Sequence, residues 1–150
     1  MRQTARSFFA IAVILTTASL LLAADPSFSR GLIQSSCAPW DGPAIAITLA
    51  PETLQCDRAP SGPYLSLGVW RGLPLHDGQV VNFGRGSDNG YASRCAKDND
   101  CQRAESGSIE FEKYNEKSGA KGRYELHFKN GETISGTFDV QWCNTRTICG

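Results

Sequence analysis

The stretch that decides the fold lies at residues 122–143 and reads GRYELHFKNGETISGTFDVQWC. Apolar residues alternate with polar ones on both sides of its centre, and a period of two places successive side chains on opposite faces of a strand. The apolar members are Tyr124, Leu126, Phe128, Ile134, Phe138, Val140 and Trp142. Asn130-Gly131 at the centre is a strong signal for a β-hairpin turn. The stretch therefore predicts two antiparallel strands joined by a short turn.

The register of this hairpin allows two solutions. A plain two-residue Asn130-Gly131 loop would set the apolar face of one strand beside the polar face of the other. A three-residue loop, 129–131, pairs Leu126 with Ile134 and lets Gly131 adopt a left-handed conformation. A two-residue turn followed by a bulge at residues 135–136 also restores the match. One of these must hold, because a one-residue slip moves every side chain to the other face.

The same segment resembles the terminal hairpin of small exported bacterial β-sandwich proteins of unknown function. The resemblance covers residues 122–143 only. It implies a protein of the bacterial envelope or exterior, and it carries no catalytic residue.

Upstream of the hairpin, shorter pieces alternate in the same way, at residues 45–49, 64–70, 81–83 and 109–112. Gly and Pro punctuate the chain between these pieces, and no window shows sustained helical spacing. We therefore predict an all-β fold: an antiparallel β-sandwich or small barrel of six to eight short strands. The polar region at residues 87–107 is expected to form a long loop.

The N-terminus has the organisation of a secretory signal. Arg2 and Arg6 precede an uncharged run at residues 8–24, which Asp25 ends. Cleavage after Ala24 or after Ser29 fits this pattern, and an uncleaved membrane anchor is the alternative. We predict a helical signal peptide at 1–24, a spacer at 25–36 and a single β domain at 37–150. The protein would be secreted or periplasmic, exported by the general secretory route.

Six cysteines behind such a signal predict disulfide bonds. Cys95 and Cys101 enclose a short polar segment, which suits a small closed loop. The other four cysteines can form either of two sets of bridges, and spacing does not choose between these sets. They are Cys37–Cys56 with Cys143–Cys149, and Cys37–Cys143 with Cys56–Cys149.

Charge and motif content argue against several classes of activity. The chain has 15 basic and 15 acidic residues, and loss of Arg2 and Arg6 would leave it slightly acidic. Nucleic-acid binders show a basic excess instead. His76 and His127 are its two histidines, and Gly-x-Ser-x-Gly and Cys-x-x-Cys do not occur. We expect no enzyme activity, no cofactor and no metal site.

The best candidate for a binding surface is formed by Trp70, Arg71 and Tyr64. If Leu65, Leu67 and Val69 face the core, Trp70 and Tyr64 face outward, because side chains alternate along a strand. Exposed aromatic residues beside an arginine are frequent binding anchors. The alternative is that a second sheet covers Trp70. Trp40 and Trp142 are expected to pack near disulfides.

The leading hypothesis is an exported, disulfide-stabilised β-sandwich that acts as a binding or structural module of the bacterial envelope or exterior. Its partner would be a protein or an envelope component and not a nucleic acid. It would be a monomer that touches membrane only through an uncleaved N-terminal segment. The alternatives are a β-barrel that binds a small ligand and a secreted hydrolase or protease inhibitor.

Overall fold

The computed structural model describes residues 27–96, 100–145 and 147–150, which contain nine β-strands and no α-helix. The predicted signal peptide at 1–24 lies outside this part of the chain. The strands are β1 (Arg30–Cys37), β2 (Pro43–Ala50), β3 (Tyr64–Val69), β4 (Gln79–Gly84), β5 (Gly90–Cys95), β6 (Cys101–Arg103), β7 (Ser106–Asn115), β8 (Gly119–His127) and β9 (Thr133–Cys143). The described residues hold no helix that could cross a membrane.

All nine strands belong to one sheet, in the order β4-β7-β8-β9-β1-β2-β3-β5-β6. β1 runs parallel to β9, and every other pair of neighbours is antiparallel. The predicted all-β class is confirmed. The prediction of six to eight strands in a wholly antiparallel arrangement is wrong, because the strand that lies beside β9 was not anticipated.

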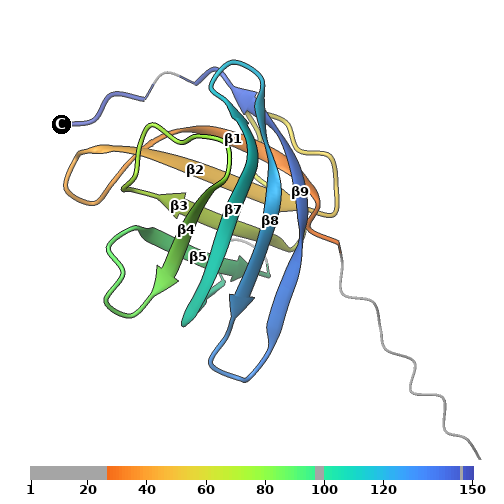
Figure 1. Cartoon of the computed structure of the whole chain (residues 1–150). Coiled ribbons are helices and arrows are strands. Elements are labelled where there is room, and N and C mark those ends of the chain that lie inside the picture. Colours follow the sequence, from red (N-terminus) through yellow and green to blue (C-terminus); the bar gives the residue numbers. More distant parts are fainter. Residues whose placement is uncertain (1–26, 97–99, 146) are drawn as a thin grey trace, which may run out of the picture.

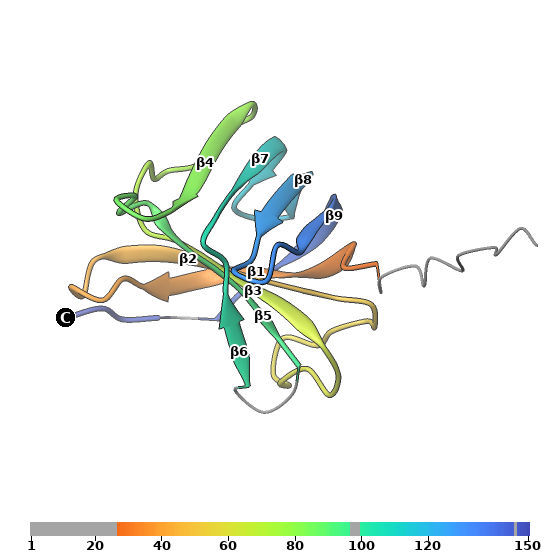
Figure 2. The ribbon, with the colours of Figure 1, turned by 90° about the horizontal axis from the view of Figure 1, so that it is seen from below.

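The sheet is curled into a half-barrel. In Figure 1, β4, β7, β8 and β9 cross in front of β1, β2, β3 and β5, and Figure 2 shows the two groups from below. Two short connections between strands hold the two groups of strands close to each other. The short turn 85–89 joins β4 to β5, although they lie near opposite ends of the strand order. Between β6 and β7, the Ala104 amide donates to the Ala92 carbonyl at 2.9 Å and the Glu105 amide to the His127 carbonyl at 2.8 Å.

The concave side of the curl holds one hydrophobic core. Phe111 is fully buried in it and meets Phe138 edge-to-face, with ring centroids 6.0 Å apart. Inward-facing residues from both groups of strands are fully buried, among them Ile33, Ile47, Leu49, Leu65, Leu67, Ile109 and Leu126. The alternating residues of the sequence supply most of this core, so the period-two pattern placed the correct faces inward.

The β8–β9 hairpin adopts the first of the two predicted registers. Leu126 pairs with Ile134, and Tyr124 pairs with Gly136. The Phe128 amide donates to the Glu132 carbonyl at 2.9 Å, which leaves residues 129–131 as the loop. Gly131 has a φ of +81°, as a left-handed loop residue should.

The prediction of a spacer at 25–36 is wrong from Arg30 onward, because β1 occupies a central place in the sheet. The C-terminal tail meets its far end, where the Thr147 hydroxyl donates to the Ser35 carbonyl at 3.0 Å. Only Ile33 of β1 is buried, and the consecutive polar residues Gln34, Ser35 and Ser36 occupy both faces, so the strand shows no alternation. The predicted loop at 87–107 is also wrong in part, since it contains β5 and β6.

Three disulfides close the fold, which confirms the disulfide-bonded character of the domain. The structure joins Cys95 to Cys101, the pairing favoured by spacing. The other two bridges are Cys37–Cys149 and Cys56–Cys143, and both considered alternatives for these four cysteines are therefore wrong. The reason is again β1, whose position beside β9 brings Cys37 close to the C-terminal tail. Three disulfides in so small a domain fit an oxidising, extracellular environment.

The loop at residues 129–131 gives a direct test of the hairpin geometry. An added Cβ would meet no atom within 4 Å at either Gly131 or Gly62, but only Gly131 has a positive φ. We expect Gly131→Ala to lower the free energy of unfolding by about 1 kcal/mol. Gly62→Ala should leave stability unchanged or raise it slightly, because it only restricts the unfolded chain. Urea denaturation measures both, and equal effects would contradict the assigned loop.

Candidate functional site

Three aromatic side chains from separate parts of the chain meet on the outer surface. Trp40 comes from the turn between β1 and β2, Trp70 directly follows β3, and Tyr91 lies on β5. The ring centroids of Trp40 and Trp70 are 5.7 Å apart, and those of Trp70 and Tyr91 are 5.8 Å apart. Trp40 is 52% exposed, and the other two rings are half-buried. We call these three residues the aromatic platform.

A tight turn holds Trp40 in place. The Ala38 amide donates to the Gly42 carbonyl at 2.8 Å, and the Asp41 amide donates to the Ala38 carbonyl at 2.9 Å. A Cβ on Gly42 would lie 2.6 Å from the Trp40 Nε1, so only glycine lets the indole fold back over the turn. The Cys37–Cys149 bridge lies one residue before this turn and fixes its base.

Tyr91 lies flat across its neighbour on β3. It pairs with Gly68, where an added Cβ would stand only 2.3 Å from the Tyr91 Cε1. The Tyr91 hydroxyl is 3.2 Å from the Ser66 hydroxyl, which fixes the far end of the ring. Trp70 is anchored by its amide, which donates to the Asn89 carbonyl at 2.7 Å. The rings therefore rest on the sheet backbone and lose little conformational freedom when a partner binds.

Arg71 adds a polar rim to the platform. Its guanidinium carbon lies 5.5 Å from the centroid of the Trp40 ring, within cation–π range. The same group lies 3.6 Å from the Asp88 carboxylate, and both side chains are largely exposed. An exposed ion pair contributes little to stability. Its effect here is local: the two charges offset each other at the rim, while the exposed Asp41 follows Trp40 in its turn.

The structure brings together two of the three predicted site residues. Trp70 and Arg71 belong to the platform or its rim, whereas Tyr64 lies at the opposite end of β3. Trp70 lies six positions after Tyr64, a distance of roughly 20 Å along a strand. Their even spacing nonetheless places both on the outward face of β3.

Sequence reasoning missed two members of the platform. Tyr91 was missed because its strand was assigned to a loop, and the short Tyr91-Ala92-Ser93 alternation is too weak to correct that. Trp40 lies near a bridge, as expected, but it is exposed and does not pack into the interior. Its proximity to Trp70 depends on the β1–β2–β3 register, which no local pattern reveals.

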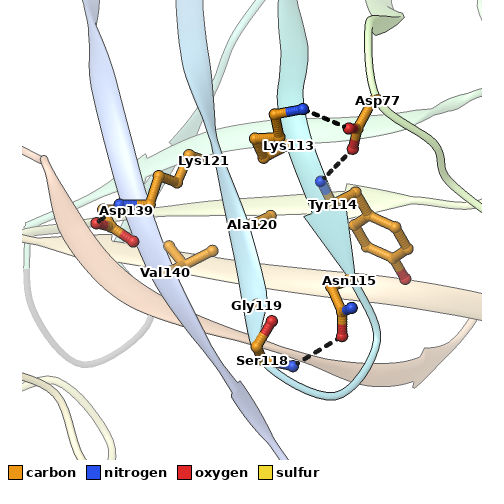
Figure 3. Close-up of a pocket in the computed structure, with 10 residues that line it drawn as sticks. All are labelled: Asp77, Lys113, Tyr114, Asn115, Ser118, Gly119, Ala120, Lys121, Asp139 and Val140. Carbon is orange, nitrogen blue, oxygen red and sulfur yellow. Dashed lines mark hydrogen bonds and ion pairs between the residues drawn. The ribbon is translucent and has the colours of Figure 1, made fainter.

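A separate groove of about 360 Å³ lies across β7, β8 and β9 (Figure 3). Its charges are paired: Lys113 Nζ lies 2.9 Å from the Asp77 carboxylate, and Lys121 Nζ lies 2.6 Å from that of Asp139. Asp77 also accepts a hydrogen bond from the Tyr114 amide at 2.8 Å. The Lys113 ammonium and this amide hold the pKa of Asp77 below its usual value. The carboxylate thus fastens the chain before β4 to β7.

The described histidines and paired acids do not assemble into a catalytic set. His76 Nδ1 is 3.0 Å from the Asp77 carbonyl, and His127 Nδ1 is 3.0 Å from the Thr133 hydroxyl. Glu110 pairs with Arg123 at 2.6 Å, and a register shift between Phe111 and Lys113 interrupts the strand beside it. The described residues contain no group of three His, Cys, Asp or Glu side chains that could hold a metal ion.

Comparison of the chain with protein-family models, with curated proteins and with solved structures finds no match. The site is therefore interpreted from its own geometry.

The buried Tyr124 and the half-buried Tyr114 test how polar groups are accommodated in this fold. Burial raises the pKa of Tyr114 to about 12, with a contribution from Glu116, and burial alone raises that of Tyr124 to about 12. The Tyr124 hydroxyl donates to the Phe28 carbonyl at 3.2 Å, whereas the Tyr114 hydroxyl is buried without a hydrogen-bond partner among the described residues.

We expect Tyr124→Phe to lower the free energy of unfolding by about 1 kcal/mol, because it leaves the Phe28 carbonyl without its donor. Tyr114→Phe should cost less than about 0.5 kcal/mol or stabilise the protein, because it removes an unsatisfied hydroxyl from an apolar place. Chemical denaturation of the two variants gives the comparison. A larger loss for Tyr114→Phe would contradict these environments.

Proposed function

We propose that this protein is an exported, non-catalytic binding module whose contact surface is the aromatic platform, with Arg71 and Asp88 at its rim. The observation that carries the proposal is the clustering of Trp40, Trp70 and Tyr91 on an outer face. Tryptophan, tyrosine and arginine are the residues most enriched at binding hot spots. The three disulfides support a role outside the reducing cytosol.

The way the platform is built also supports this proposal. Burying these rings in the core would have stabilised the fold by about 1.5–3 kcal/mol for each large apolar side chain. Instead, Gly42 and Gly68 leave the space that Trp40 and Tyr91 occupy on the surface. A preorganised group of exposed rings lowers the entropic cost of association.

The alternatives receive less support from the same observations. A barrel that holds a small ligand needs an internal cavity, but the inward-facing side chains pack into one cluster. A hydrolase needs a base within reach of a nucleophile in a cleft. Here His76 and His127 both lie at the exposed surface, and the ion pairs around the groove in Figure 3 leave its lysines and aspartates engaged.

The test is saturable binding of the labelled protein to cell walls, membranes and secreted proteins isolated from the producing organism. We expect Trp40→Ala and Trp70→Ala each to weaken binding at least about ten-fold, since each removes a central ring. Val80→Ala is the matched control, because Val80 is 50% exposed on β4, a strand without a platform residue. Wild-type affinity in the double tryptophan variant would contradict the proposal, and so would the absence of saturable binding to every fraction.

A further inference from the structure

The outward face of β3 extends the aromatic platform into a linear strip. Tyr64, Ser66, Gly68 and Trp70 follow one another at even spacing on this face, and Tyr91 covers Gly68. Ser66 pairs with Thr48 on β2 and with Ser93 on β5. Ser93 is buried, so two partly exposed hydroxyl-bearing residues, Thr48 and Ser66, lie between the platform at one end of β3 and Tyr64 at the other. We call this arrangement the β3 strip.

We infer that the β3 strip binds a neutral, linear polysaccharide whose chain runs along β3. This inference rests on the proposed function and specifies the ligand class of the same surface. A sugar ring presents an apolar face of C–H groups and an edge of hydroxyl groups. The strip offers both counterparts, with aromatic faces for the C–H groups and hydroxyl groups for the edge.

The length of the strip favours a polymer. Trp70 and Tyr64 lie roughly 20 Å apart along the strand, which spans several consecutive sugar rings. Small ligands bind in concave pockets that bury most of their surface. Tyr91 lines a groove of about 450 Å³ together with Arg85 and Arg103, but neither Trp40 nor Trp70 lines it. An open, elongated surface suits a chain that gains affinity from several shallow contacts.

The charges at the platform favour a neutral ligand. Arg71 and Asp88 face each other at 3.6 Å, and the exposed Asp41 follows Trp40, so the platform carries no excess of positive charge for an anionic ligand. A cationic ligand would compete with the Arg71 guanidinium, which already lies over the Trp40 ring. An anionic ligand would meet the Asp88 carboxylate beside the only guanidinium placed on the platform rings. A polymer without charge avoids both costs.

The composition of the strip also distinguishes a glycan from a folded protein partner. Protein interfaces bury a close-packed apolar centre. The middle of the β3 strip instead carries Thr48 and Ser66, with Gly68 beneath the Tyr91 ring. This arrangement has aromatic rings at the ends and hydroxyl groups between them. It is more complementary to a chain of sugars than to the apolar centre of a protein interface.

The test is electrophoresis of the folded protein through native gels that contain hydroxyethylcellulose, glycol chitin or the acidic polymer polygalacturonate. We expect at least one neutral polymer to retard the protein, and the retardation to persist in salt. Trp40→Ala and Trp70→Ala should weaken it at least about ten-fold, while Trp70→Phe retains part of it. Val80→Ala should match the wild type. Far-UV circular dichroism verifies that each variant is folded.

Tyr64→Ala gives a second readout, because Tyr64 lies outside the platform. It should weaken binding of long oligosaccharides, measured by tryptophan fluorescence, and leave binding of disaccharides unchanged. Equal effects on long and short chains would overturn the placement of the polymer along β3.

Three outcomes overturn the inference. They are retardation by polygalacturonate alone, retardation that salt abolishes, and no retardation by either neutral polymer. If binding to cell fractions still depends on Trp40 and Trp70 in such a case, the proposed function stands and only the ligand class is wrong. If binding to cell fractions does not depend on Trp40 and Trp70 either, the proposed function and the proposed ligand class are both wrong.

Discussion

The structure depends on the placement of β1 between β9 and β2. Its parallel pairing with β9 and its antiparallel pairing with β2 join the two groups of strands into one sheet. The fit is close: a Cβ on Gly31 would lie 1.9 Å from the Thr48 carbonyl oxygen, so the two backbones approach as only glycine allows. Since β1 and β9 come from opposite ends of the described chain, this pairing closes the longest loop in the fold and has the highest entropic cost.

Two disulfides offset that cost, because each constrains the unfolded chain over a long separation. Cys37–Cys149 and Cys56–Cys143 span 112 and 87 residues, and bridges of this span contribute about 4–5 kcal/mol each in the chain-entropy model. The Cys37–Cys149 bridge also influences where the aromatic platform lies on the surface. The turn that carries Trp40 begins directly after Cys37, and the β2–β3 register sets the distance from Trp40 to Trp70. The platform is thus a consequence of how β1 is held.

The parts of the fold that are local in sequence could be predicted. The hairpin register followed from matching Leu126 with Ile134, and the Cys95–Cys101 bridge followed from spacing. β1 could not be recognised, because it has one buried side chain, Ile33, and polar residues at Gln34, Ser35 and Ser36 on both faces, so the alternation that marks a half-exposed strand is missing. The remaining disulfides depend on β1 and were mispaired for that reason. At the site, Trp70 was predicted from strand phase and Arg71 from its place beside Trp70, whereas Trp40 and Tyr91 join them only through long-range pairing.

The central claim is that β1 is held against β9 by bridges that connect distant parts of the chain. The most direct measurement is mass-spectrometric mapping of disulfide-linked peptides after proteolysis of the unreduced protein. The account predicts linked peptides that contain Cys37 with Cys149, Cys56 with Cys143, and Cys95 with Cys101. Peptides that join Cys37 to Cys56 and Cys143 to Cys149 would contradict it.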